Sequence, residues 1–509
     1  MFFRKKRNKS GTYSIQAVEK IGRRNVVRKT FGTSRDEAEL QRLEHKARQW
    51  IDSQEHGPRL PFAYDQDIAI DNFMSTLCNT QVKVHGPELV YGALYDQMGY
   101  GEIEDEMFRH LVVCRLFNPG SKLKTIDYLM RYLHVSVTKH RIYSFIDRLS
   151  PAEGCGIKEQ VERISYANTL KALGGKVGVV FYDMTTLYFE AADEDDLRLC
   201  GFSKDGKHSN PQIFLGLLVA AGGNPIGYEI FEGNISEGKT LIPMIETLAG
   251  RFGFDHPTVV ADAGLLSKKN LDALEAAHYQ YILGARPKND TEAVKRKILK
   301  MQLKDGQVRS FKRQDGRRMV VSMSDNRARK DAHNRAEGLR KLEKKLGSGR
   351  LTKKNINNRG YNKYLHMEGE VSISIDYDRF QADSAWDGIK AYITNSKLAP
   401  RKIVSHYHNL WFIERAFKMN KTDLRIRPIY HRLRNRIEGH ICICFTAYAI
   451  MLELERRLKK AGMNLSLDKA GELTKTIYSI TYTLPETREQ KTRVLKMTDE
   501  QQRLVEIAQ

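Results

Sequence analysis

The 509-residue sequence has few cysteines, no long apolar run and fewer acidic than basic residues. Its six cysteines form no CxxC pair and are too sparse for a disulfide framework, which predicts a reducing, cytosolic environment. The longest uncharged apolar run, residues 441–452, has twelve residues, whereas a membrane-spanning helix needs about 20. No apolar stretch follows the basic residues of MFFRKKRNKSG at the start, so no secretory signal is expected. These absences argue against a secreted disulfide-stabilised protein and against a transmembrane protein.

The basic residues are concentrated in three segments. The chain has 84 Lys and Arg against 62 Asp and Glu, a net charge of +22. Residues 1–30 carry +9, residues 286–363 carry +17 and residues 401–440 carry +7, which leaves −11 on the rest of the chain. Each segment alone could be a solvated face. Three of them on an otherwise acidic chain favour several contacts with one long polyanion, most simply a nucleic acid.

The length predicts about three domains at roughly 150 residues each, and 41% hydrophobic residues are enough for folded cores. Residues 1–56 predict a basic hairpin, turning at Gly22, followed by a helix; residues 57–61 predict a linker. Residues 86–150 predict a helical region with a probable role in DNA binding. Its last two helices could form a helix-turn-helix motif that offers cations to DNA, although a plain helical bundle is the simpler interpretation. The cations of that motif would be Lys139, His140, Arg141 and Arg148.

Residues 171–455 have the pattern of an α/β layer fold, because buried strand-like runs are followed by alternating helices and strands. The predicted strands are 177–183, 213–221, 226–231, 258–262 and 281–285. The regularity breaks between about 286 and 385, which predicts an insertion within this domain. Residues 456–509 are expected to form a C-terminal helical tail.

Two aspartates end apolar strands. Asp183 follows VGVVFY and Asp262 follows VVA. A buried carboxylate is costly unless it is paired or binds a metal, and ligands of α/β sheets collect at strand ends. Each aspartate alone could equally be a helix cap or a turn former.

A third acid lies in a later helical segment, HYHNLWFIERAFKMNK. Tyr407, Glu414 and Lys421 are seven residues apart, so on a continuous helix they would form one line along a face. The alternative is a surface Glu–Lys pair on an amphipathic helix.

Together the three acids have a chemical use. Two divalent ions about 4 Å apart, held by carboxylates, can support phosphodiester displacement, and Mg²⁺ prefers such oxygen ligands. Zinc is not expected, because His406 and His408 are two residues apart on a helix and point to different sides, as do Cys442 and Cys444.

The sequence resembles the DDE transposases of bacterial insertion sequences over about residues 100–455. The matching stretches are FYDMTTLYFE (181–190), GFSKDGKHSNPQ (201–212), VVADAGLLSKKN (259–270) and YHNLWFIERAFKMNK (407–421). The resemblance implies an RNase H-like mixed-sheet core, interrupted by a β-rich insertion, behind an N-terminal hairpin-helix and a helical DNA-binding region. It also implies that Asp183, Asp262 and Glu414 are the catalytic residues and metal ligands.

The subgroup with this insertion has a Tyr–Arg–Glu–Lys signature. Tyr407, Glu414 and Lys421 match it, and Leu410 occupies the arginine position. The resemblance implies that Tyr407 and Lys421 contact DNA phosphate, while Arg415 or Lys418 could partly replace the missing arginine.

The implied activity is transposition with two Mg²⁺ or Mn²⁺ ions. Water first cleaves the ends of the element, and the freed 3′-OH then attacks target DNA. The implied partners are double-stranded DNA (terminal inverted repeats and target) and at least one further copy of the chain, in the nucleoid of a bacterial cytoplasm. A structure-selective nuclease without strand joining and a non-catalytic DNA-binding derivative remain alternatives.

Overall fold

The computed structural model divides into two compact units, residues 1–81 with 481–491 and residues 82–480 with 492–509. The residues it describes are 1–56, 62–149, 156–190, 193–201, 209–253, 256–348, 351, 356–357, 360–368, 372–485 and 487–509. The predicted linker at 57–61 and most of the matching stretch 201–212 lie outside the described residues, as do four cations of the basic run: Arg350, Lys353, Lys354 and Arg359.

The first unit contains the predicted hairpin. Strands β1 (Phe2–Arg7), β2 (Tyr13–Ile21) and β3 (Arg24–Ser34) form an antiparallel sheet. Gly22 has φ +61° in the turn between β2 and β3, a conformation that favours glycine. Helix α1 (Glu37–His56) packs its apolar stripe on Ile15 of β2, and helix α2 (Phe62–Ser75) follows. The sequence patterns therefore predicted the β2–β3 hairpin and helix α1, whereas strand β1 and helix α2 were not predicted.

The second unit begins with the predicted helical region. Side-chain caps at Asp105, Ser121 and Thr138 start three of its helices. The α-helices are α3 (Ala93–Gln97), α4 (Glu106–Phe117), α5 (Lys122–Tyr132), α6 (Lys139–Arg148) and α7 (Ile157–Ala172). Of the four predicted DNA-facing residues, Arg148 is ion-paired with Asp105 at 3.2 Å; the others, Lys139, His140 and Arg141, are exposed at the start of α6.

The centre of the second unit is an eight-stranded mixed sheet in the order β10-β11-β14-β9-β8-β5-β6-β7. Five strands match the predicted ones: β5 (Val179–Tyr188), β6 (Gln212–Ala220), β7 (Pro225–Glu232), β8 (Thr258–Ala261) and β9 (Tyr281–Ala285). Strands β5, β6 and β7 form an antiparallel meander, whereas β8 and β9 run parallel to β5. The first strand is thus central, with the second and third on one side and the fourth and fifth on the other. This order confirms the predicted RNase H-like α/β core.

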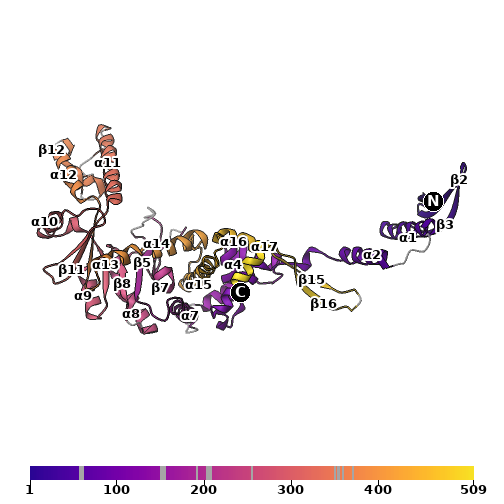
Figure 1. Ribbon diagram of the computed structural model, residues 1–509, viewed down its shortest axis with the longest axis horizontal. Helices are drawn as coiled ribbons and strands as arrows, with labels where there is room; N and C mark the ends of the chain where they lie inside the picture. Colours follow the sequence, from indigo (N-terminus) through magenta and orange to yellow (C-terminus); the bar gives the residue numbers. More distant parts are fainter. Residues whose placement is uncertain are drawn as a thin grey trace. The chain divides into compact units, whose positions relative to one another are not determined.

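The insertion lies between β9 and β14 (Ile389–Thr394). Its elements are α10 (Glu292–Lys300), β10 (Val308–Lys312), β11 (Arg318–Met323), α11 (Asp325–Gly347), β12 (Leu365–Glu368), β13 (Ser372–Ile375) and α12 (Tyr377–Ala382). Strands β10 and β11 extend the central sheet through β14. Elements α11, α12 and β12 gather at the same end of the sheet, with Leu342, Tyr364, Leu365 and Ile375 buried in a small core of their own (Figure 1).

The two faces of the sheet are covered by different helices. Tyr182 and Val180 of β5 lie in the core under α8 (Leu241–Phe252) and α9 (Lys268–Ala276). Phe181 lies in the opposite core, with residues of α13 (Pro400–His408), α14 (Trp411–Lys418) and α15 (Arg434–Lys460). Because side chains alternate along a strand, Asp183 belongs to the α13–α14 face.

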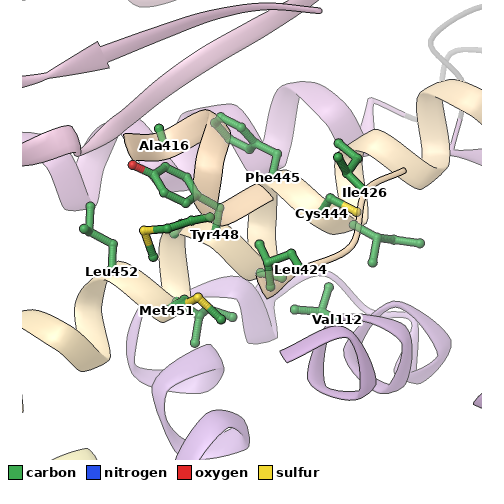
Figure 2. Close-up of a cluster of buried hydrophobic side chains, with 14 of the residues drawn as sticks. Val112, Ala416, Leu424, Ile426, Cys444, Phe445, Tyr448, Met451 and Leu452 are labelled. Atoms are coloured by element: carbon green, nitrogen blue, oxygen red, sulfur yellow. The ribbon is translucent and has the colours of Figure 1, made fainter. Parts of the chain in front are cut away.

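Helix α15 is the core helix of the second unit. Its apolar window is long enough to cross a membrane, yet 89% of that window is buried inside the protein. Figure 2 shows Phe445 and Tyr448 of this helix close to Ala416 of α14, and places Val112 of α4 in the same cluster. The remaining elements are strands as well as helices: β4 (Val82–Val84), α16 (Leu467–Thr474), β15 (Tyr478–Thr483), β16 (Gln490–Val494) and α17 (Asp499–Ala508). The prediction that residues 456–509 form only helices is therefore wrong, because this segment also contains β15 and β16. Strand β15 pairs with β4, a partner far away in sequence that the local pattern could not reveal.

Candidate active site

Asp183 and Asp262 lie side by side on neighbouring strands. The parallel pairing of β5 with β8 ends at Tyr182 opposite Ala261, and the two aspartates are the next residue on each strand. Parallel strands keep their register, so the aspartates reach the same level of the sheet. Asp183 is half-buried and Asp262 is exposed. The strand register thus brings the ends of the two apolar runs next to each other.

Tyr407 of α13 holds the Asp262 carboxylate. Its hydroxyl donates a hydrogen bond to Oδ1 of Asp262 at 2.6 Å, and its ring packs on Tyr392 with centroids 4.7 Å apart. Burial, reinforced by the bond to Asp262, raises the pKa of Tyr407 far above its usual range, so the hydroxyl remains a donor. Gly284 of β9 makes room for this contact, because a Cβ there would collide with the Tyr407 hydroxyl and lie 2.9 Å from the Ala263 nitrogen.

Lys390 of β14 is a site residue that the sequence did not reveal. Its Nζ lies 5.5 Å from the centre of the Tyr407 ring. Burial lowers the pKa of Lys390, Arg327 lowers it further, and the carboxylates of Asp262 and Glu414 oppose that change. Asp262 and Glu414 therefore both act electrostatically on this ammonium group. Nothing in the sequence distinguishes this lysine from the 84 basic residues; only the position of β14 beside β9 brings it here.

The segment that carries Glu414 is not the single helix that was predicted. Helix α13 ends at His408, α14 begins at Trp411, and Lys421 lies in a π-helical turn, Met419–Asp423. Between α13 and α14, the Phe412 nitrogen bonds the Asn409 oxygen at 3.0 Å, a tighter i to i−3 bond. The prediction of one straight line of side chains is wrong for this reason. Tyr407 is buried, Glu414 exposed and Lys421 half-buried.

The cations predicted around Glu414 differ in their surroundings. Leu410, at the position of the signature arginine, is 7% exposed and belongs to the hydrophobic core. Arg415 is ion-paired with Glu455 of α15 at 2.5 Å, whereas Lys418 is exposed at the end of α14. The pair with Glu455 fixes α14 on the core helix, so Lys418 is the more accessible of the two proposed replacements for the arginine. That Tyr407, Lys421, Arg415 and Lys418 bind DNA stays a prediction.

The donors for a divalent ion are carboxylate oxygens. Asp183 and Asp262 present them at one level, and the Tyr407 hydrogen bond fixes one of the two groups, as second partners of metal ligands commonly do. Within the described ranges, no three His, Cys, Asp or Glu side chains gather closely enough to hold a metal ion. The oxygen donors of the two aspartates suit Mg²⁺ or Mn²⁺, but the described structure does not bring Glu414 together with them as a three-ligand group.

A cavity of about 540 Å³ opens beside Asp262. Tyr407 and Lys390 form one wall, and the insertion supplies cations on the other. Its charged lining residues are Asp262, Lys288, Arg327, Asp331, Arg335, Lys363, Asp387 and Lys390. Arg335 pairs with Asp387, and Lys288 with Asp383 at 3.4 Å, so carboxylates hold part of this basic wall in place. The basic insertion therefore lines the space next to the candidate metal ligands, where a phosphate backbone would be attracted.

The family described as Transposase DDE domain matches residues 181–450, more than half of the chain. The chain belongs to the DDE transposase family. The match includes Asp183, Asp262 and Glu414, and it agrees with the strand order of the central sheet.

Two solved complexes are similar to this transposase at low identity. A piggyBac transposase synaptic complex with hairpin DNA has 10% identity and a TM-score of 0.38, covering 76% of each chain. A Mos1 transposase paired-end complex with the left transposon end has 11% identity and a TM-score of 0.16, covering 47% of this chain and 71% of the other. Scores this low do not by themselves identify a common fold. A comparison with curated proteins finds no match.

Proposed function

We propose that this transposase cleaves the ends of a bacterial insertion sequence and joins the freed 3′-OH to target DNA. The observation that carries the proposal is the pair of aspartates in register on β5 and β8, one of them held by Tyr407, within the DDE domain. Adjacent carboxylates at the end of parallel strands suit divalent ions that act on a phosphodiester.

The residues have separate roles in this proposal. Asp183 and Asp262 would hold two Mg²⁺ or Mn²⁺ ions, with Glu414 as the third acid; bound metal would activate the attacking oxygen and stabilise the leaving oxygen. Tyr407 keeps the Asp262 carboxylate in one orientation. Lys390 offers a cation beside these acids, and Lys421 binds a DNA phosphate near the cleaved bond.

The basic wall of the cavity holds the DNA backbone next to the acids, because its cations come from the insertion and from β14. The proposal includes terminal inverted repeats and target DNA as ligands, a dimer or larger assembly as the active form, and a bacterial cytoplasm with the nucleoid as the location. The DDE family membership supports DNA as the substrate class.

The test is a strand-transfer assay with a pre-cut element end. The inverted repeats that flank the element give the duplex sequence, and a labelled duplex with a free 3′-OH is incubated with Mg²⁺ and a target plasmid. Joined product is the expected result. Cleavage of an uncut end without any joining would identify a nuclease, and neither reaction, by a protein that still binds the duplex, would identify a non-catalytic DNA-binding derivative.

A further inference from the structure

A second cavity, of about 490 Å³, lies in the helical part of the second unit. It is bounded by the start of α5, by α4 and α15, and by the segment 425–431. Its basic lining residues are Arg115, Lys122, Lys124, Arg425, Arg427, His431 and His440. None of the described residues that line it is acidic. The mechanism proposed above uses none of these side chains.

Two of the cations are buried without a carboxylate. Lys122 and Arg115 are each 5% exposed. The Lys122 ammonium lies 3.4 Å from Nδ1 of His440, and the Arg115 guanidinium lies 3.5 Å from the Leu424 oxygen. Nε2 of His440 lies 3.0 Å from the Ile426 oxygen, so that nitrogen carries the ring proton and Nδ1 is the acceptor. In the part of the chain that the structure describes, neither cation forms an ion pair.

Buried cations elsewhere in this protein do have carboxylate partners. Lys158 is 7% exposed and lies 3.0 Å from Glu229; Arg198 is 5% exposed and lies 2.7 Å from Asp195. A buried charge without a counterion is costly. Burial, with Arg115 close by, lowers the pKa of Lys122 to about 7, which expresses that cost. The second cavity therefore presents two buried basic groups whose charge a bound anion would neutralise.

The chemistry of the lining favours phosphate. Ser121 caps α5 at the wall of the cavity, so backbone N–H groups of a helix start lie beside the two cations. A guanidinium can pair with two oxygens of one phosphate, and an ammonium with a third. At the rim, Arg425 is exposed and Tyr430 is 72% exposed, which offers a cation and a ring face to a nucleotide.

We propose that this second cavity binds a phosphate group of the DNA backbone through Lys122 and Arg115. The proposal rests on the proposed function, because it takes DNA as the ligand. The rim residues Arg425 and Tyr430 belong to the basic segment 401–440, one of the three segments expected to contact a nucleic acid. This second DNA contact would be formed by α4 and α5, which precede the catalytic sheet in the sequence and belong to the same compact unit as the sheet.

The first experiment measures thermal unfolding of the full-length protein with inorganic phosphate, against chloride at equal ionic strength. Phosphate should raise the melting temperature of the wild type by several degrees. Lys122→Met should raise the melting temperature in chloride, because it removes an uncompensated charge, and should abolish the phosphate-dependent increase. The matched control is Lys158→Met, which should lower the melting temperature in both buffers and retain the increase.

An increase that persists in both Lys122→Met and a second variant, Arg115→Gln, would overturn the phosphate site. If Lys122→Met fails to fold, Arg115→Gln alone decides the point, by loss or retention of the phosphate-dependent increase.

The second experiment measures binding of a 30-base-pair element-end duplex as a function of salt. Loss of one phosphate contact should flatten the log–log slope by about 0.9 in Lys122→Met. An unchanged slope would overturn DNA as the source of the phosphate. Asp262→Asn should keep both effects, so failure of the phosphate site is distinguishable from failure of the catalytic proposal, which only cleavage and joining measure.

Discussion

The hydroxyl of Tyr407 and the carboxylate of Asp262 meet across 145 positions of the sequence, at 2.6 Å. The bond joins α13 to the end of β8. The position of one candidate metal ligand therefore depends on a helix that comes much later in the sequence. It also shows why Gly284 is needed between them, since any side chain there would occupy the place of the hydroxyl.

Tyr407→Phe should reduce metal-dependent cleavage by about 10- to 100-fold, the usual cost of removing an outer-shell partner of a metal ligand. The ring packing on Tyr392 is kept, so the melting temperature should change little. The matched control is Tyr281→Phe, because Tyr281 donates an equally short bond, 2.6 Å, to Glu275 on the other face of the sheet. Equal losses of cleavage in the two variants would contradict a specific role for Tyr407.

Gly284→Ala should impair cleavage more than it impairs folding. The added methyl would force Tyr407 away from Asp262, and the nearby Ala263 nitrogen, 2.9 Å from the new carbon, leaves no room for adjustment. Gly178→Ala is the control, since a Cβ there meets nothing within 4 Å. Cleavage rates and melting temperatures of both variants should be recorded together; wild-type cleavage by Gly284→Ala would show that the Tyr407 contact is dispensable.

Asp183→Asn, Asp262→Asn and Glu414→Gln should each abolish Mg²⁺- or Mn²⁺-dependent cleavage of element-end DNA. Each amide keeps the size of the side chain and removes the charge that holds a divalent ion. Duplex binding should persist, because it depends on lysines and arginines elsewhere. Electrophoretic binding assays and thermal melts accompany the rates. A triple variant that cuts and joins DNA at the wild-type rate would refute the assignment.

The stability of the wild type should rise with pH above neutrality more than that of Lys122→Met. The pKa of Lys122 is about 7 in the folded chain against 10.5 for an ordinary lysine, so the unfolded chain binds one more proton between these values. The free energy of unfolding then increases by about 1.4 kcal/mol per pH unit in that window. The other ionisable groups that act on this ammonium are Arg115, His431, His440, Cys114 and Cys444.

These neighbours should not obscure the effect. Burial lowers the pKa of His431 to about 4, lowers that of His440 well below its usual value, and raises the pKa of Cys114 to about 12. The advantage of Lys122→Met in phosphate-free melts should therefore be larger at about pH 6.5 than at about pH 9. An advantage that stays constant over this range would show that Lys122 keeps one protonation state.

The parts of the site that sequence reasoning found are those with a local signal. Asp183 and Asp262 each end an apolar run, and adjacent parallel strands place such ends together. Lys390 gave no signal, because its role depends on β14 joining the sheet beyond β9 after a long insertion. The break at Asn409 was missed for a different reason: the heptad-like spacing from Tyr407 to Lys421 suits a helix, and the tightened turn between α13 and α14 leaves no mark in hydrophobic periodicity.

Helix α15 has a consequence for how the chain is made. Phe181 on β5 contacts Phe412 on α14, and α14 in turn is joined to α15 by the Arg415–Glu455 ion pair, so one face of the sheet is covered by segments synthesised more than two hundred positions later. While the ribosome completes that distance, the apolar strands of the sheet remain exposed to solvent on this face. Chains released before residue 400 would lack α13, α14 and α15, so fragments of this protein should aggregate instead of competing with the full-length transposase for its DNA.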